Sequence, residues 1–333
     1  MNIAINGFGR IGRSVYRILS SNSEHKIVAI NDLSDAGALA YLLRHDTVMG
    51  NFDGQVSIES GNLLSPNQVV KIVNEPDPGK LPWKEFEVDI VVEATGIFRE
   101  RGQLAKHLKS GAKKVVLTVP SKDEIDYTVV LGVNDEGINE SHNIISNASC
   151  TTNCLAPMAK VLNENFGIVE GVINTVHAYT NDQRLADVPH KDWRRSRAAA
   201  ENIIPTSTGA ARAVGKVLPE LDGKLDGIAS RVPVPNGSAV DLFVKLESEV
   251  SAKMVNDAIL NASKSESFNR ILEYSDSPVV SKDIIGNSSS SIYDVRETRV
   301  LSRKYLRTLN WYDNEWGYSN RVVDLINRLK KFI

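Results

Sequence analysis

Hydrophobic residues in the first half of the chain form short runs that alternate with amphipathic stretches. Several runs are apolar throughout, which is typical of strands buried on both faces of a parallel sheet. The amphipathic stretches between them predict helices that connect the strands by right-handed crossovers, so we expect an α/β, doubly wound fold. The predicted strands are Asn2–Asn6, Lys26–Asn31, Asp89–Ala94, Lys114–Thr118, Thr128–Gly132 and Asn143–Ser146, and the predicted helices are Ile11–Ser20, Ala36–Leu43 and Leu104–Leu108.

The pattern changes after about residue 167, where the apolar segments become longer and partly alternating. Ile168–Ala178, Leu225–Val234 and Val240–Glu249 suit an antiparallel sheet with one covered face. Helices are predicted over Ala252–Ser263 and Glu315–Lys331. We therefore expect a doubly wound domain over residues 1–149 and an α+β domain with a largely antiparallel sheet over 150–314. The C-terminal helix, about 315–333, is predicted to pack back on the first domain.

Composition agrees with two globular domains and excludes several classes of protein. The 333 residues exceed the length at which a single core stops growing, and 42% are hydrophobic, which excludes a disordered chain. With 39 basic and 41 acidic residues, the net charge of −2 argues against binding nucleic acid or membranes by bulk charge. No apolar stretch predicts a membrane span, and no basic segment precedes the first apolar run as in a signal peptide. We expect a cytoplasmic protein.

The first predicted strand leads directly into a complete G-x-G-x-x-G loop that opens a helix. Gly7, Gly9 and Gly12 allow a tight turn, close backbone approach to a pyrophosphate and close packing of helix on strand. Asp32 lies 32 − 12 = 20 residues beyond the last glycine, at the end of the second strand. A carboxylate there accepts hydrogen bonds from a ribose 2′-OH and repels a 2′-phosphate. The sequence therefore predicts a Rossmann-type domain that binds NAD rather than NADP.

A candidate nucleophile lies where the two domains meet in the sequence. Cys150 follows a strand and precedes an apolar helix, and the positive end of a helix favours a thiolate. Cys154, one turn further on, is interpreted as a core residue. Among six histidines, His177 ends an apolar strand and begins a loop, a position from which catalytic groups are presented. No group of residues has metal-ligand spacing, so we predict no metal.

Four segments together resemble the phosphorylating glyceraldehyde-3-phosphate dehydrogenases. They are Gly7–Gly12 with Asp32, Ser146–Cys154, His177–Gln183 and Trp311–Asn320. The resemblance implies that Cys150 attacks the aldehyde of glyceraldehyde 3-phosphate and that His177 takes the proton. A hydride then passes to NAD, and inorganic phosphate cleaves the resulting thioester to 1,3-bisphosphoglycerate. Only a nucleophile that is also a good leaving group suits this chemistry.

The resemblance also implies roles for other residues and a homotetramer. One phosphate site consists of Thr180, Asp182 and Arg231, and the other of Ser149, Thr151, Thr208 and Gly209 with Arg195 nearby. Hydroxyls and a glycine amide ahead of a helix, as at Thr208 and Gly209, suit an anion. The loop from about 180 to 200 is implied to lie at a subunit interface. The additional cofactor residues are Arg10 and Ile11 at the pyrophosphate, Thr95 and Thr118 on the nicotinamide side, and Asn314 at the carboxamide.

Two alternatives remain from the sequence. An erythrose-4-phosphate dehydrogenase shares the cysteine motif and the fold, but such enzymes typically depart from the His-Ala-Tyr-Thr-Asn-Asp-Gln segment that this chain keeps. A dinucleotide-binding scaffold with Cys150 as a redox sensor is the second, since thiols of low pKa oxidise readily. Two phosphate sites would have no purpose in such a sensor. Dependence of NADH formation on inorganic phosphate separates these hypotheses.

Overall fold

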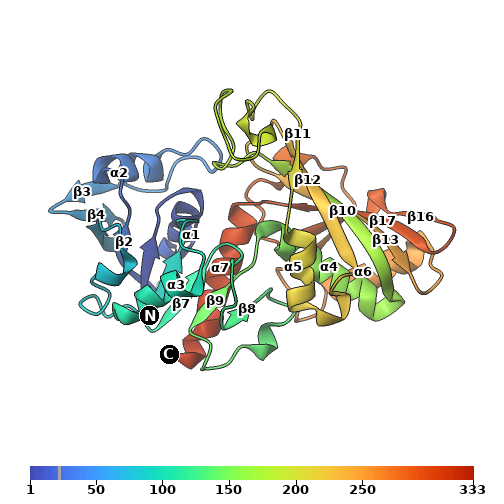
Figure 1. Cartoon of the computed structure of the whole chain (residues 1–333), viewed down its shortest axis with the longest axis horizontal. Coiled ribbons are helices and arrows are strands. Elements are labelled where there is room, and N and C mark those ends of the chain that lie inside the picture. Colours follow the sequence, from blue (N-terminus) through green and yellow to red (C-terminus); the bar gives the residue numbers. More distant parts are fainter. Residues whose placement is uncertain (22–23) are drawn as a thin grey trace. The chain divides into compact units, whose positions relative to one another are not determined.

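The computed structural model describes residues 1–21 and 24–333, which form two compact units (Figure 1). The first unit comprises residues 1–129, 136–148 and 319–333. The second comprises residues 130–135 and 149–318. The sequence-based boundary lies one residue after the division between Ala148 and Ser149. The short segment 130–135, which groups with the second unit, was not foreseen.

The first unit contains a nine-stranded sheet in the order β3-β4-β5-β2-β1-β6-β7-β9-β8. Strands β5, β2, β1, β6, β7, β9 and β8 pair in parallel, as the uninterrupted apolar runs predicted. Ile3, Ile5 and Val91 are fully buried, as both faces of such a sheet require. The strands are β1 (Asn2–Asn6), β2 (Lys26–Asn31), β3 (Ser57–Glu59), β4 (Asn62–Ser65), β5 (Gln68–Val73), β6 (Ile90–Glu93), β7 (Lys114–Leu117), β8 (Tyr127–Thr128) and β9 (Ile144–Ser146).

Two details of this sheet differ from the sequence prediction. The antiparallel meander β3-β4-β5 was not predicted, because its strands are short and its tight turn at Ser60 and Gly61 requires positive φ angles of 49° and 74°. The predicted strand Thr128–Gly132 is wrong beyond Thr128. The Asn134 side chain accepts a hydrogen bond from the Val130 amide at 2.9 Å, and Gly132 has a φ of +79°, so the backbone turns there instead of extending.

Three α-helices of the first unit each come directly after a strand of its sheet: α1 (Arg10–Ser20) follows β1, α2 (Ala36–Arg44) follows β2 and α3 (Arg101–Lys109) follows β6. Asp35 caps α2 by accepting a hydrogen bond from the Ala38 amide at 3.0 Å. Strands β2 and β5 extend the sheet from one edge of β1, and β6 and β7 extend it from the other edge. The strand order therefore reverses between β1 and β6. Ligands of doubly wound sheets bind at the carboxyl ends of strands at such a switch point.

The second unit is built on an eight-stranded sheet in the order β11-β12-β10-β13-β17-β15-β14, with β16 paired to β17. Most neighbours are antiparallel, but β10 and β12 are parallel, as are β14 and β15. The predicted fold class is confirmed. The strands are β10 (Ile168–Ala178), β11 (Ile204–Ser207), β12 (Leu225–Val232), β13 (Ser238–Leu246), β14 (Leu272–Ser275), β15 (Ser291–Asp294), β16 (Arg299–Leu301) and β17 (Tyr305–Tyr312).

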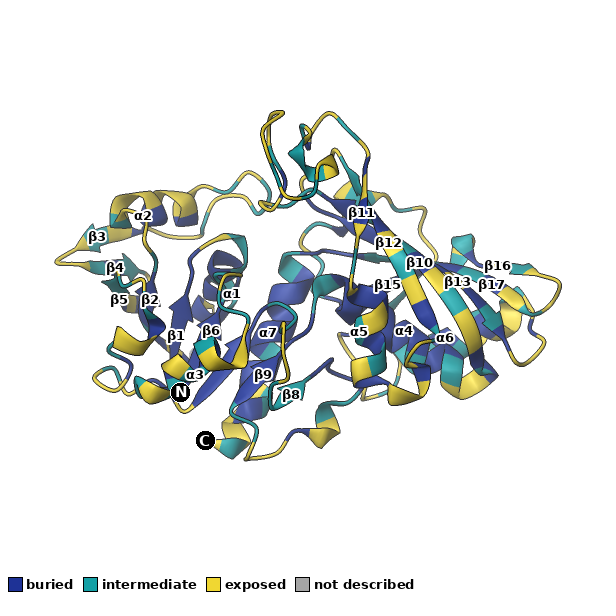
Figure 2. Cartoon of the chain, in the orientation of Figure 1, coloured by how far each residue is buried: buried dark blue, intermediate teal, exposed yellow. Residues whose placement is uncertain are grey.

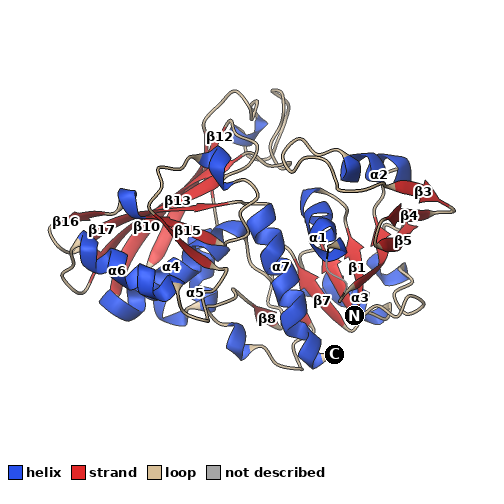
Figure 3. Ribbon diagram, turned by 180° about the vertical axis from the view of Figure 1, so that it is seen from behind, coloured by secondary structure: helices blue, strands red, loops and turns tan. Residues whose placement is uncertain are grey.

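Helices cover one face of this second sheet (Figure 3). They are α4 (Cys150–Phe166), α5 (Ala210–Val217) and α6 (Ala252–Ser263). The last helix, α7 (Trp316–Leu329), follows β17 and from Ser319 onward belongs to the first unit. The other face is open, with Val172, Ile228 and Phe243 about half exposed at 58%, 51% and 47% (Figure 2). In residues 1–21 and 24–333, none of the helices combines the length and the apolar character needed to cross a membrane.

Candidate active site

The thiol of Cys150 lies at the first residue of α4. Ser149 caps this helix: its backbone is extended, and its hydroxyl accepts a hydrogen bond from the Thr152 amide at 3.0 Å. The preceding residue, Ala148, has a φ of +52°, an uncommon conformation for a non-glycine residue. Cys150 therefore lies at the positive end of the α4 dipole, as the sequence predicted.

His177 lies next to this thiol. It occupies the penultimate position of β10, and its Nε2 is 3.5 Å from Cys150 Sγ. On the neighbouring parallel strand β12, Arg231 is the register partner of His177. We call Cys150, His177 and Arg231 the thiol corner. The structure thus brings together the two residues that sequence analysis paired, and it adds a cation directly beside them.

The other ring nitrogen of His177 has two competing partners. Nδ1 is 2.6 Å from the carbonyl oxygen of Ala178 and 2.6 Å from Arg231 Nη1. A proton on Nδ1 would be donated to the Ala178 carbonyl, leaving Nε2 as an acceptor for the thiol proton. A hydrogen bond from Arg231 instead requires an unprotonated Nδ1 and puts the proton on Nε2. The position of Arg231 therefore selects the tautomer of His177.

The electrostatics of the thiol corner do not favour a resting ion pair. Burial raises the pKa of the Cys150 thiol above its usual value, and the positive charge of Arg231 acts in the opposite direction. Burial and the neighbouring Arg231 lower the pKa of His177 to about 3. The imidazole is therefore neutral at pH 7 and has the capacity to accept a proton only if its Nε2 lone pair faces the sulfur.

A tyrosine that sequence analysis did not single out lies beside this pair. The Tyr312 hydroxyl is 2.8 Å from Thr151 Oγ1 and 2.9 Å from Thr175 Oγ1, and its ring meets His177 edge-on with centroids 5.9 Å apart. Tyr312 is buried, and burial raises its pKa well above its usual value. It ends β17 with its side chain on the inward face. Hydropathy does not alternate along that strand, so the sequence carried no local signal for Tyr312.

The first predicted phosphate site contains buried donors without partners. Arg231 donates to the Ala178 carbonyl at 2.9 Å, but its Nε is buried and unpaired. Gln183, for which no role was predicted, accepts from the Thr180 amide at 3.3 Å, and its Nε2 is also buried and has no partner among the described residues. Asp182 is exposed and forms an ion pair with Arg195. Unpaired buried donors are costly, so these two suit an anionic ligand.

The second predicted site combines hydroxyls and helix starts. Thr208 and Gly209 precede α5, where the Thr208 hydroxyl accepts from the Ala210 amide at 3.2 Å. The hydroxyl of Ser149 lies 2.7 Å from Thr152 Oγ1, whereas that of Thr151 is already bonded to Tyr312. Arg195 donates to Thr206 Oγ1 at 2.9 Å and pairs with Asp182 of the first predicted site.

The glycine loop of the first unit has the geometry of a dinucleotide cradle. A Cβ at Gly7, whose φ is +93°, would lie 2.7 Å from the Thr95 amide nitrogen, and one at Gly12 would lie 2.1 Å from the Gly7 oxygen. A Cβ at Gly9 would instead face open space, with no atom of residues 1–21 or 24–333 within 4 Å. It precedes α1, and no side chain caps that helix. The backbone therefore leaves room and donors for a pyrophosphate, and these residues fit NAD.

Asp32 is held at the end of β2 as a charged acceptor. Its carboxylate accepts hydrogen bonds from the Phe8 amide at 2.8 Å and the Ser34 amide at 2.9 Å. Although burial acts to raise the pKa of Asp32, these backbone donors lower it overall. The Arg10 side chain pairs with Asp46, and Ile11 is half-buried in the first turn of α1. A negative charge at residue 32 disfavours a 2′-phosphate.

Three further predicted cofactor residues are fixed by hydrogen bonds. Thr95 and Thr118 of the first unit both bond to Glu93, by way of its side chain and its carbonyl respectively. In the second unit, Asn314 Oδ1 accepts from the Ser238 hydroxyl at 2.7 Å. That bond leaves the amide Nδ2 as the donor end of Asn314. A donor of this kind suits a carboxamide oxygen.

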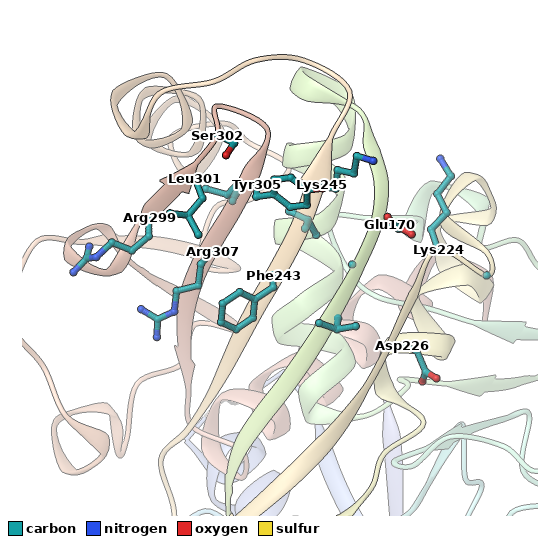
Figure 4. A pocket seen from close by; sticks show the side chains of 15 residues that line it. Glu170, Lys224, Asp226, Phe243, Lys245, Arg299, Leu301, Ser302, Tyr305 and Arg307 are labelled. Carbon is teal, nitrogen blue, oxygen red and sulfur yellow. The ribbon is translucent and has the colours of Figure 1, made fainter.

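A groove elsewhere in the second unit contains none of the predicted site residues. It crosses the open face of the sheet over β10, β12, β13 and β17 (Figure 4). Phe243 and Tyr305 are among its apolar residues, and Lys245, Arg307 and Asp226 among its charged ones. Over the described part of the chain, no cluster of three or more histidine, cysteine, aspartate or glutamate residues could hold a metal ion.

Comparison with known families identifies both parts of the chain. Residues 1–101 match the profile "Glyceraldehyde 3-phosphate dehydrogenase, NAD binding domain", and residues 149–314 match "Glyceraldehyde 3-phosphate dehydrogenase, C-terminal domain". Among curated proteins, glyceraldehyde-3-phosphate dehydrogenase 1 of Bacillus subtilis is 53% identical over 332 residues, covering 99% of this chain and 98% of that one. The Geobacillus stearothermophilus enzyme is 54% identical over 326 residues, covering 98% and 97%. The Borreliella burgdorferi enzyme is 53% identical over 337 residues, covering 99% and 100%.

Proposed function

Because the chain belongs to the glyceraldehyde-3-phosphate dehydrogenase family, we propose that it oxidises glyceraldehyde 3-phosphate with NAD and inorganic phosphate. The product is 1,3-bisphosphoglycerate. The observation that carries the assignment of residues is the distance of 3.5 Å between Cys150 Sγ and His177 Nε2 at the start of α4. A thiol beside a neutral imidazole is the arrangement of an activated nucleophile.

In the proposed mechanism, His177 accepts the thiol proton as Cys150 Sγ bonds to the aldehyde carbon, giving a hemithioacetal. The backbone amide of Cys150 and the protonated His177 stabilise the developing oxyanion, and His177 then gives its proton to that oxygen, forming the hydroxyl and returning to the neutral state. His177 then removes the hydroxyl proton of the hemithioacetal as the hydride leaves, so that a thioester remains on Cys150. NAD, when bound, supplies the hydride acceptor, and we assign Asn314 Nδ2 to its carboxamide. Phosphate attacks the thioester carbon and releases the thiolate.

Arg231 connects substrate binding with the state of His177 in this proposal. Its guanidinium now faces His177 Nδ1 at 2.6 Å, with Nε unpaired. A substrate phosphate that engages Arg231, together with Thr180 and Asp182, would draw the cation from Nδ1. The Ala178 carbonyl would then be the remaining partner of Nδ1, and Nε2 would become the acceptor that the thiol requires. Inorganic phosphate would bind at Ser149, Thr151, Thr208 and Gly209, with Arg195 nearby.

We propose a homotetramer, and the open face of the second sheet supports one of its contacts. Val172, Phe243 and Tyr305 are about half exposed there, at 58%, 47% and 50%, beside both acidic and basic side chains. Such a mixed surface is self-complementary, as a two-fold contact between identical chains requires. A second exposed apolar set lies in the loop after β10, where Leu185 and Trp193 are 83% and 87% exposed.

The domain assignment and the location of the protein also belong to this proposal. We assign residues 1–149 to the NAD-binding domain, with the helix at about 315–333 packed on it, and residues 150–314 to the catalytic domain. The family profiles over 1–101 and 149–314 support this division. We place the enzyme in the cytoplasm, where glycolysis or gluconeogenesis would use it.

The test is the initial rate of NADH formation from glyceraldehyde 3-phosphate. We expect a rate with NAD that requires inorganic phosphate and falls strongly with NADP. Arsenate replacing phosphate should sustain turnover, because it also cleaves a thioester. A rate obtained only with erythrose 4-phosphate would make the protein an erythrose-4-phosphate dehydrogenase. No rate with either aldehyde would leave the redox-sensor hypothesis.

A further inference from the structure

A buried carboxylate lies at the switch point of the first sheet, directly behind the glycine loop. Glu93 ends β6, and its side chain is fully buried. Its Oε2 accepts hydrogen bonds from Asn6 Nδ2 at 2.5 Å and His107 Nε2 at 3.0 Å. Its Oε1 accepts from the Thr95 amide at 2.9 Å and from the Thr95 hydroxyl. Four donors converging on two oxygens satisfy an ionised carboxylate, which can only accept.

A residue deeper in the core orients one of the donors that bind Glu93. Trp83 is fully buried, and its indole Nε1 donates to His107 Nδ1 at 2.9 Å. Because an indole N–H can only donate, Nδ1 must be an acceptor, and the proton of the neutral imidazole lies on Nε2, directed at Glu93. The hydrogen bonds therefore run in one direction, from Trp83 through His107 to Glu93. The tautomer of His107 is set by Trp83.

On its other side, Glu93 holds the two threonines that the family resemblance places at the nicotinamide. The carboxylate binds the amide and hydroxyl of Thr95, and the Glu93 carbonyl accepts from the Thr118 amide at 3.1 Å and the Thr118 hydroxyl at 3.0 Å. The backbone of Thr95 packs closely against the glycine loop, because a Cβ at Gly7 would lie only 2.7 Å from the Thr95 amide nitrogen. The Glu93 side chain thus connects the buried core to Thr95, which lies against the glycine loop.

We propose that the Glu93 side chain is a positioning group for the nicotinamide half of the dinucleotide, acting through Thr95 and itself oriented by His107 and Trp83. This inference rests on the proposed binding of NAD. Packing alone does not explain a charge at this position, because an apolar side chain would fill the space without requiring four donors. The carboxylate instead fixes the direction in which the Thr95 hydroxyl points.

Glu93→Gln is the primary variant, because it keeps the shape and replaces one acceptor oxygen by a donor. Its NH2 group would face donors in either orientation, Asn6 Nδ2 and His107 Nε2 on one side or the Thr95 amide on the other. The side chain must therefore shift, and Thr95 should lose its fixed geometry. We expect the Kd for NAD, measured by isothermal titration calorimetry, to rise at least about tenfold. The Kd for ADP-ribose, which lacks the nicotinamide, should change by less than about twofold.

Asp126→Asn is the matched control in the same unit. Asp126 accepts from the Asn143 and Ile144 amides, both at 2.8 Å, and pairs with Arg101, but it lies outside the network of Glu93. It should lower the unfolding temperature while leaving both Kd values unchanged. An unchanged Kd for NAD in Glu93→Gln, or an equal loss for NAD and ADP-ribose, would overturn the proposal. Failure of the wild type to bind NAD would instead refute the proposed function.

The direction of the hydrogen bonds gives a second test. In Glu93→Gln, His107 could accept from the new amide only by moving its proton to Nδ1, where the Trp83 N–H blocks it. Adding Trp83→Phe removes that block, so the double variant should bind NAD more tightly than Glu93→Gln alone. No recovery would show that Trp83 does not set the tautomer.

Variants of His107 test the same network if Glu93→Gln does not fold. His107→Gln supplies both a donor and an acceptor and should retain NAD affinity. His107→Leu supplies neither and should lose affinity for NAD but not for ADP-ribose. Equal affinities of the two variants for NAD would contradict the proposal.

Discussion

In the glycine loop of the first unit, the atoms left for a ligand belong to the backbone, whereas the reactive atoms of the thiol corner belong to side chains. The loop offers space because Gly9 has no side chain, and a Cβ there would meet no described atom within 4 Å. Behind the loop, both carboxylate oxygens of Glu93 already accept hydrogen bonds. At the thiol corner, Arg231 Nε lacks a partner, and His177 Nδ1 has two competing ones. The polar groups that shape the dinucleotide site thus have their hydrogen bonds before any ligand binds. The reactive groups of the thiol corner keep hydrogen-bonding capacity for the substrate.

The largest expected effect comes from removing the sulfur of the thiol corner. Cys150→Ser should lower turnover at least about 10³-fold, because a buried hydroxyl is a far weaker nucleophile than a thiol. The Kd for NAD should stay within about twofold, since the glycine loop is untouched. Rates of NADH formation and calorimetric titration measure the two effects. Cys154→Ala, one helical turn further on, is the control and should retain turnover. Wild-type turnover in Cys150→Ser would rule out the covalent mechanism.

An intermediate effect should come from adding a methyl group to the glycine loop. Gly7→Ala places a Cβ 2.7 Å from the Thr95 nitrogen at a φ of +93°, so it should cost about 1–3 kcal/mol of folding stability as well as NAD affinity. Gly9→Ala meets no protein atom, so only NAD affinity should fall. Denaturant unfolding and NAD titration separate the two. Wild-type affinity in Gly9→Ala would show that no ligand approaches there.

The smallest effect concerns the stability of the thiol corner in acid. His177 has a folded-state pKa of about 3, while an unfolded histidine takes up its proton below about pH 6.5. Between these values the unfolded state binds more protons, so folding stability falls as the pH falls. The contribution of His177 is a slope of about 1.4 kcal/mol per pH unit, which His177→Asn should remove. Denaturant titrations from pH 6.5 to 4.5 test it, and equal slopes in both proteins would contradict the buried, neutral state.

The sequence predicts the parallel sheet and its glycine loop well because these depend on local patterns. Uninterrupted apolar runs such as Val91 and Val92 specify buried strands, and the spacing of Gly7, Gly9 and Gly12 specifies the turn. The strand β17 escaped prediction for the opposite reason. Its inward positions include the buried polar residues Thr308 and Asn310, so burial alternates along the strand while hydropathy does not.

Contacts between distant residues could not be predicted from the pattern. Local patterns indicated Cys150 and His177 separately, and the family resemblance paired them. The position of Arg231 beside His177 depends on the register between β10 and β12. Tyr312 reaches the same corner from a strand far along the chain. Glu93 did carry a local signal, since a charge at the end of a buried strand is rare without partners. Its partners Asn6 and His107 emerged only from the fold.

The indole of Trp83 also gives the protein an internal optical label. It is the only tryptophan of the first unit, since Trp193, Trp311 and Trp316 belong to the second. Its surroundings are dry and its N–H is bound to an imidazole, while Trp193 is 87% exposed. Emission at short wavelengths should therefore include the signal of Trp83, and emission from Trp193 should lie further to the red. Fluorescence spectra of Trp83→Phe and the unchanged protein, recorded during unfolding, differ by the signal of Trp83 and so follow the first unit without any added dye.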